Sequence, residues 1–119
     1  MNIFSEKICY HILMIKNYKN ACIYKLVHYF DQNENFVYIG TTTNWSVRKY
    51  QHKRRCNDQN DRGYNYKVYK YIRKFGGWNN WCMIKIEDYP CNGPEKLTQR
   101  ENYYIQLYNS KLNSQNLIY

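Results

Sequence analysis

The pattern of apolar and polar residues near the start of the chain predicts a β-hairpin. Residues 23–28 and 36–39 are two runs rich in β-branched and aromatic residues, and the polar stretch DQNEN lies between them. Tyr24 belongs to the first run and Tyr38 to the second. If these two tyrosines lie nearly opposite each other, their side chains share one face of the sheet.

Three helices and one more strand are expected after the hairpin. The sequence TTTN supplies N-cap residues for a helix over 45–55, and two glycines stop a second helix over 66–75. Residues 81–89 read as a strand, and Pro94 lies in the first turn of a last helix. This order, β-β-α-α-β-α, predicts an α+β domain in which a small three-stranded antiparallel sheet is flanked by helices.

The length and the charge distribution narrow the function. The 119 residues suffice for one domain, which we place at 21–119 after an N-terminal extension at 1–20 that packs on it. The net charge is +9, and the segment 48–74 holds ten basic residues against two acidic ones. Such a basic segment, interleaved with tyrosines, is typical of proteins that bind nucleic acid. The alternative is a solvated charged face.

The cysteines and the apolar segments suggest an intracellular protein. The five cysteines show no spacing suited to zinc, and their odd number without a secretory leader favours reduced thiols. The apolar patch at 8–16 is too short to span a membrane. The abundance of Asn, Lys, Tyr and Ile is associated with AT-rich genomes, which suggests a phage or a large virus and hence the compartment of an infected cell.

One pair of polar residues in the first predicted helix is a candidate for chemistry. Arg48 and His52 are four residues apart and share one helix face, which would present a cation and a titratable base to the tyrosines. The alternative is an ordinary basic helix surface.

Glu101 interrupts an apolar helix stripe that is formed by Leu97, Tyr104 and Tyr108. A carboxylate in such a position requires a compensating partner. That partner is either an arginine in a salt bridge or Mg²⁺, and the sequence leaves both open.

Several short motifs, taken in order, resemble those of the GIY-YIG endonucleases. The first motif stands as Cys22-Ile23-Tyr24, with cysteine where the family has glycine, and the second as Tyr38-Ile39-Gly40. The stretch YKYIRKFGGW looks like the family's second-helix signature, and RENYYIQLYNSKLNSQN like its C-terminal block. The resemblance covers residues 21 to 118. The single polar residues that it carries over are Arg48, His52, Glu101 and Asn116.

The resemblance implies metal-dependent hydrolysis of DNA on a three-stranded sheet flanked by helices. Glu101 would hold one Mg²⁺ or Mn²⁺ ion, and Arg48 would neutralise charge on the phosphate. Tyr24 would be the base that activates water, with a pKa lowered by Arg48 and the metal, while Tyr38 positions water or phosphate. His52, with an ordinary pKa near 6.5, is the rival base or a relay for the proton of Tyr24.

The remaining implied roles concern orientation and DNA binding. Asn116 would orient the other groups by hydrogen bonds. Flanking phosphates would be bound without base readout by five basic residues, which are Lys53, Arg54, Arg55, Lys67 and Lys70.

Two other classes of function compete with a nuclease. One is a catalytically inactive nucleic-acid-binding module that uses the same basic, tyrosine-rich face. The other is an interaction protein whose charge serves only solubility. No appended DNA-recognition domain is evident, so high sequence specificity is not expected. Homing, repair and restriction roles all stay open, as does a protein partner or a homodimer.

Overall fold

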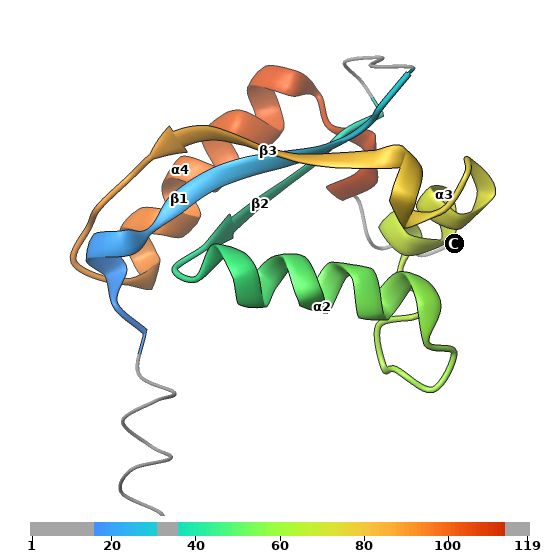
Figure 1. Cartoon of the computed structure of the whole chain (residues 1–119). Coiled ribbons are helices and arrows are strands. Elements are labelled where there is room, and N and C mark those ends of the chain that lie inside the picture. The colour runs from blue at the N-terminus through green and yellow to red at the C-terminus, as the bar shows by residue number, and fades with distance from the viewer. Residues whose placement is uncertain (1–15, 31–35, 114–119) are drawn as a thin grey trace, which may run out of the picture.

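The computed structural model describes residues 16–30 and 36–113 (Figure 1). None of the helices in these ranges is long and apolar enough to cross a membrane. The strands are β1 (Cys22–His28), β2 (Tyr38–Thr42) and β3 (Trp81–Asp88). The α-helices are α2 (Trp45–Asn57), α3 (Lys67–Lys74) and α4 (Pro94–Tyr108), and short 3₁₀ turns lie at Tyr18–Asn20, Trp78–Asn80 and Lys111–Asn113.

The three strands form one antiparallel sheet in the order β2-β1-β3, which confirms the predicted fold class. β1 and β2 pair as the hairpin pattern predicts, although β2 begins two residues later than expected and continues to Thr42. Tyr24 lies opposite Gly40, whereas Tyr38 lies opposite Leu26. The two tyrosines are therefore diagonal neighbours on one face.

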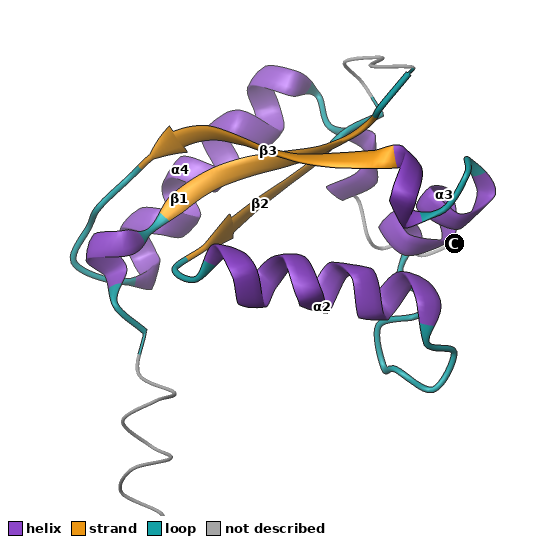
Figure 2. Ribbon diagram, in the orientation of Figure 1, coloured by secondary structure: helices purple, strands orange, loops and turns teal. Residues whose placement is uncertain are grey.

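Alternating side chains of the strands build two cores, one on each face of the sheet. Ile23, Val27 and Ile39 pack with Leu97 and Tyr104 of α4. Tyr24 and Leu26 point the other way and pack against residues of α3 and the turn that follows it. Figure 2 shows the same division, with α2 and α4 on opposite sides of the sheet.

The helix boundaries follow the capping signals in the sequence. The side chain of Asn44 accepts a hydrogen bond from the backbone N–H of Val47 at 3.2 Å, so α2 begins where TTTN predicts. Gly76 and Gly77 have φ angles of 99° and 81°, and they end the α3 segment as expected. At the other end of α2, Arg73 donates to two carbonyls of the last turn, those of Arg55 and Cys56, at 3.3 Å each.

The N-terminal extension is described only from residue 16 onward, and residues 1–15 lie outside the described residues. Within the described part, the Tyr18 carbonyl accepts a hydrogen bond from the backbone N–H of Cys91 at 3.1 Å. Tyr18 also packs against the α4-side core. The domain boundary at residue 21 stays a prediction.

Asn113 holds the outer edge of β2. Its Oδ1 accepts a hydrogen bond from the backbone N–H of Ile39 at 2.7 Å, and its Nδ2 donates to the carbonyl of Ile39 at 2.7 Å. The Ser110 hydroxyl donates to the same Oδ1 at 2.7 Å, which orients the amide. β2 is an edge strand, so this side chain supplies the pairing that a neighbouring strand would otherwise give.

We predict that Asn113→Ala destabilises the protein by about 1 to 3 kcal/mol for each backbone group of Ile39 left without a partner. Urea denaturation of this variant beside Asn102→Ala, which truncates an exposed asparagine on α4, measures the difference. Equal midpoints for the two variants would contradict the role assigned to Asn113.

Candidate active site

Tyr24 lies at the centre of the candidate site, and Gly40 makes its position possible. The side chain is fully buried, with 0% of its surface exposed, and it lies across the backbone of Gly40. A Cβ atom on residue 40 would approach within 2.5 Å of Tyr24 Cζ and still closer to its hydroxyl, and within 2.9 Å of a ring carbon of Tyr38. Only glycine therefore leaves room for the two rings, whose centroids are 6.5 Å apart.

Cys22 takes the position where the resemblance expects glycine. It is buried, and it pairs with Thr42 of β2 and Asp88 of β3. The ladder to β3 contains a register shift between Ile23 and Tyr24, and the ladder to β2 continues without one. The thiol is thus accommodated without displacing Tyr24 from its place opposite Gly40.

One guanidinium joins both tyrosines. Arg48 Nε donates to the Tyr24 hydroxyl oxygen at 3.1 Å, and Nη2 donates to the Tyr38 hydroxyl oxygen at 3.5 Å. Nη1 donates to Gln51 Oε1 at 3.1 Å, and this hydrogen bond helps to fix the orientation of the Arg48 guanidinium. The predicted orientation of Arg48 toward the tyrosine face is confirmed.

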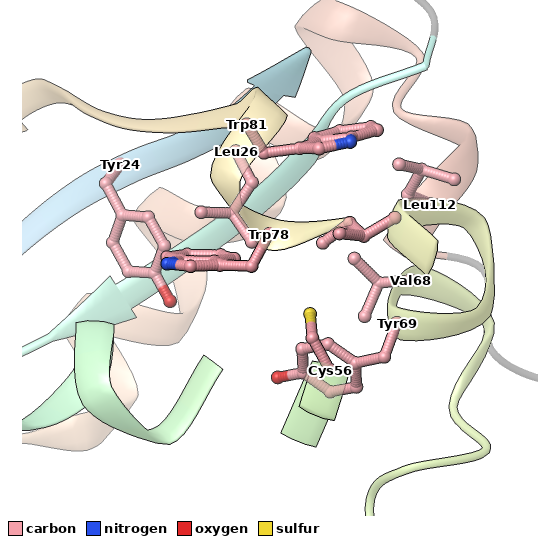
Figure 3. Close-up of a cluster of buried hydrophobic side chains, with 9 residues drawn as sticks. Tyr24, Leu26, Cys56, Val68, Tyr69, Trp78, Trp81 and Leu112 are labelled. Atoms are coloured by element: carbon pink, nitrogen blue, oxygen red, sulfur yellow. The ribbon is translucent and has the colours of Figure 1, made fainter. Parts of the chain in front are cut away.

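His52 lies one turn further along α2 and is fully buried. Its Nε2 is 2.6 Å from the Tyr24 hydroxyl, and its Nδ1 is 2.7 Å from the Tyr69 hydroxyl. The Trp78 ring stacks on the imidazole with centroids 6.0 Å apart. His52 is therefore held between two phenols. Figure 3 shows these two phenols, Tyr24 and Tyr69, with Trp78 near them.

Burial dominates the protonation of these groups. It raises the pKa of Tyr24 above its ordinary value, Tyr38 raises it further, and Arg48 opposes the rise. Arg48 thus acts in the expected direction, but burial outweighs it, so the pKa of Tyr24 is raised rather than lowered. Burial, followed by the positive charges of Arg48 and Arg55, lowers the pKa of His52 to about 3. The expectation of an ordinary histidine pKa is wrong, and His52 is neutral at physiological pH.

Glu101 reaches the site from α4. It is half-buried on the stripe with Leu97 and Tyr104, as predicted, and burial raises its pKa. The guanidinium of Arg48 and a hydrogen bond from the Thr41 side chain act in the opposite direction. Among the described residues Glu101 has no ion pair within 4.0 Å, which removes the salt-bridge interpretation for this part of the chain.

The donor set at Glu101 fits a magnesium-type ion. The described residues contain no group of three or more His, Cys, Asp or Glu side chains that could enclose a metal. A single carboxylate whose burial is incompletely compensated is nevertheless the ligand that suits Mg²⁺, because this ion keeps several waters and takes one or two carboxylates.

The predicted phosphate-binding residues fall into two groups. Lys53 and Lys70 are exposed and Lys67 is half-exposed. Arg54 instead lies 3.4 Å from the Asp61 carboxylate, and Arg55 lies 3.6 Å from the same side chain. Part of the basic charge of the segment is therefore neutralised within the protein itself.

Sequence reasoning missed Tyr69 and Asn113 as parts of the site. Val68, Tyr69 and Ile72 form the buried stripe of α3, and a buried tyrosine hydroxyl on such a stripe needs a hydrogen-bond partner. That signal could have identified Tyr69, although not its partner. Asn116, the asparagine predicted for the site, lies outside the described residues.

Comparison with known families agrees with this geometry. No curated protein and no solved structure matches the chain. The family described as the GIY-YIG catalytic domain matches residues 9–116, which is nearly the whole chain. The chain therefore belongs to the GIY-YIG family, a family of nucleases.

Proposed function

We propose that the protein is a Mg²⁺- or Mn²⁺-dependent endonuclease that hydrolyses phosphodiester bonds of DNA. The observation that carries the proposal is the hydrogen-bonded cluster in which Arg48 and His52 both contact the Tyr24 hydroxyl. Glu101 is close enough to Arg48 for the positive charge to act against the rise of its pKa. A buried base, a fixed cation and one hard carboxylate are the parts that phosphoryl chemistry requires.

Each residue of the cluster has a distinct role in this proposal. A metal ion on Glu101 would supply Lewis-acid stabilisation of the leaving 3′ oxygen. Arg48 places a fork of donors where negative charge develops on the phosphorus-bound oxygens. Tyr24 accepts the proton of the attacking water as a phenolate, while Tyr38 positions the water or the phosphate. The water oxygen bonds to phosphorus as the bond to the 3′ oxygen breaks.

The approach to Tyr24 leads past Tyr38 and Arg48. Both side chains are half-buried, whereas Tyr24 and His52 are fully covered. A phosphate that binds Arg48 would therefore lie next to the Tyr24 hydroxyl. The exposed amines of Lys53 and Lys70 would bind neighbouring phosphates without reading bases.

One observation favours a second candidate function. Tyr24 is buried, and its pKa is raised rather than lowered, which suits a structural tyrosine in an inactive nucleic-acid-binding module. The two candidates make opposite predictions for the hydroxyl of Tyr24, because a binding module does not need it for chemistry.

We predict that the wild-type chain nicks supercoiled plasmid DNA in Mg²⁺ and that Tyr24→Phe lowers the rate by about a hundredfold or more, since general-base catalysis contributes on this scale. DNA binding in chelator should stay the same, because the positive charges are unchanged. A plasmid nicking assay and a binding titration measure the two effects.

Tyr103→Phe is the matched control for this experiment, because Tyr103 is a half-exposed tyrosine on α4 outside the cluster. It should nick at the wild-type rate. Wild-type nicking by Tyr24→Phe would exclude Tyr24 as the base, and a wild-type chain that binds DNA without cutting it would favour the inactive module.

We predict that Glu101→Gln lowers Mg²⁺-dependent nicking by about a hundredfold or more, because the Lewis acid loses its carboxylate. In chelator near neutral pH the variant should be as stable as the wild type or more stable. Since burial raises the folded-state pKa of Glu101, the wild type loses stability as pH rises through that pKa. Below pH of about 4 both side chains are neutral, and the difference should vanish.

Thermal unfolding in chelator across this pH range, beside nicking assays, tests both parts of the prediction. Glu95→Gln, at the exposed start of α4, is the matched control and should keep full activity. A structural ion pair at Glu101 would give the reverse result, a loss of about 3 to 5 kcal/mol in a variant that still cuts.

A further inference from the structure

Tyr24, His52 and Tyr69 form a linear hydrogen-bonded chain inside the protein. The Tyr24 hydroxyl contacts His52 Nε2 at 2.6 Å, and the Tyr69 hydroxyl contacts His52 Nδ1 at 2.7 Å. Neutral imidazole carries one N–H donor and one acceptor nitrogen, so the two links must point the same way along the chain. Either His52 donates to Tyr24 and accepts from Tyr69, or it does the reverse.

A guanidinium lies near the phenol at each end of this chain. Arg48 Nε donates to the Tyr24 oxygen at 3.1 Å, and Arg55 is close enough to Tyr69 to oppose the rise that burial causes in its pKa. Arginine can only donate, so neither phenol can direct its proton to its guanidinium. The three groups carry three protons in all, one on each phenol and one on the imidazole. Only two hydrogen bonds join the groups, so the phenol at one end keeps a proton that has no acceptor within the chain.

The two ends differ in what happens to this extra proton. Both phenols are buried, with Tyr24 0% and Tyr69 1% exposed, so burial alone does not distinguish the ends. An extra proton on Tyr69 would stay without an acceptor throughout the reaction, because its hydroxyl faces His52 and the Arg55 guanidinium, which cannot accept. An extra proton on Tyr24 is instead the one that leaves when the phenolate forms.

We propose that Tyr69 is a positioning residue that holds His52 in the tautomer with its proton on Nε2, so that His52 donates to the Tyr24 oxygen. This inference rests on the proposed nuclease function, and it replaces the expected role of His52 as a base or proton relay. Arg48 and His52 then both donate to Tyr24, and two donors favour the phenolate over the phenol. No proton moves onto His52 in this arrangement.

The electrostatic surroundings of His52 agree with a neutral donor. Arg48 and Arg55 both disfavour a second positive charge between them, and burial adds to their effect. Within the described residues, the tyrosines in ring contact with His52 are Tyr24, Tyr38 and Tyr69, and none of these is an anion at neutral pH. Transfer of the Tyr24 proton to His52 would form an imidazolium beside the Tyr24 phenolate, and burial together with Arg48 and Arg55 disfavours that imidazolium.

The tautomer can be measured without any cleavage. Nitrogen-15 NMR of the imidazoles in the free, metal-free protein reports which ring nitrogen carries the proton, and loss of one signal set in His52→Gln assigns His52 among the three histidines. We expect a neutral ring with the proton on Nε2. In Tyr69→Phe, where Nδ1 loses its donor, we expect a shift toward the other tautomer.

Tyr66→Phe is the matched control, because Tyr66 is an exposed tyrosine beside the start of α3 whose ring lies near Tyr69. It should leave the His52 signals unchanged. A wild-type ring protonated on Nδ1, or a Tyr69→Phe ring that keeps the wild-type tautomer, would overturn the proposal.

Nicking rates give a second, independent readout. Glutamine at position 52 keeps a neutral N–H donor but cannot take up a proton, whereas alanine keeps neither property. If His52 donates to Tyr24, His52→Gln should nick at least tenfold faster than His52→Ala. Equal rates for the two folded variants would favour the relay and contradict the donor role. Failure of the wild type to cut would refute the proposed function but would leave the NMR result standing as the test of the tautomer.

Discussion

The packing of the Tyr24 ring against the bare backbone of Gly40 is the constraint on which the candidate site depends. No side chain fits at position 40, so the phenol can cross its partner strand and place its hydroxyl at the start of α2. Arg48 and His52 then reach that one oxygen from successive turns of the helix. A Cβ at position 40 would displace the Tyr24 ring and so separate its hydroxyl from Arg48 and His52 of α2.

The edge strand β2 is where the two faces of the sheet meet. Tyr38 and Gly40 face the α2 side, while Thr41 lies on the α4 side, where its side chain hydrogen-bonds to Glu101. Asn113 fixes the backbone between them at Ile39. The carboxylate and the tyrosine cluster therefore come from opposite layers and meet at β2, the edge strand of the sheet.

Much of this arrangement follows from local sequence signals. The alternation in β1, the Asn44 cap and the glycines after α3 determine the elements, and the spacing of Arg48 and His52 places both on one helix face. Protonation was not predictable in the same way. The pKa values of Tyr24 and His52 depend on how completely the fold buries them, and that depends on contacts among residues far apart in the chain. Tyr69 was missed for the same reason, because its partner is seventeen residues away on another helix.

The central claim is that the phenolate of Tyr24 accepts the proton of the attacking water. The most direct measurement replaces Tyr24 alone with a fluorinated tyrosine, whose phenol is more acidic, and follows the single-turnover cleavage rate against pH in Mg²⁺. The acidic limb of the profile should move to lower pH, and the same replacement at Tyr103 should leave it in place. A profile that does not move when the phenol of Tyr24 becomes more acidic would contradict the claim.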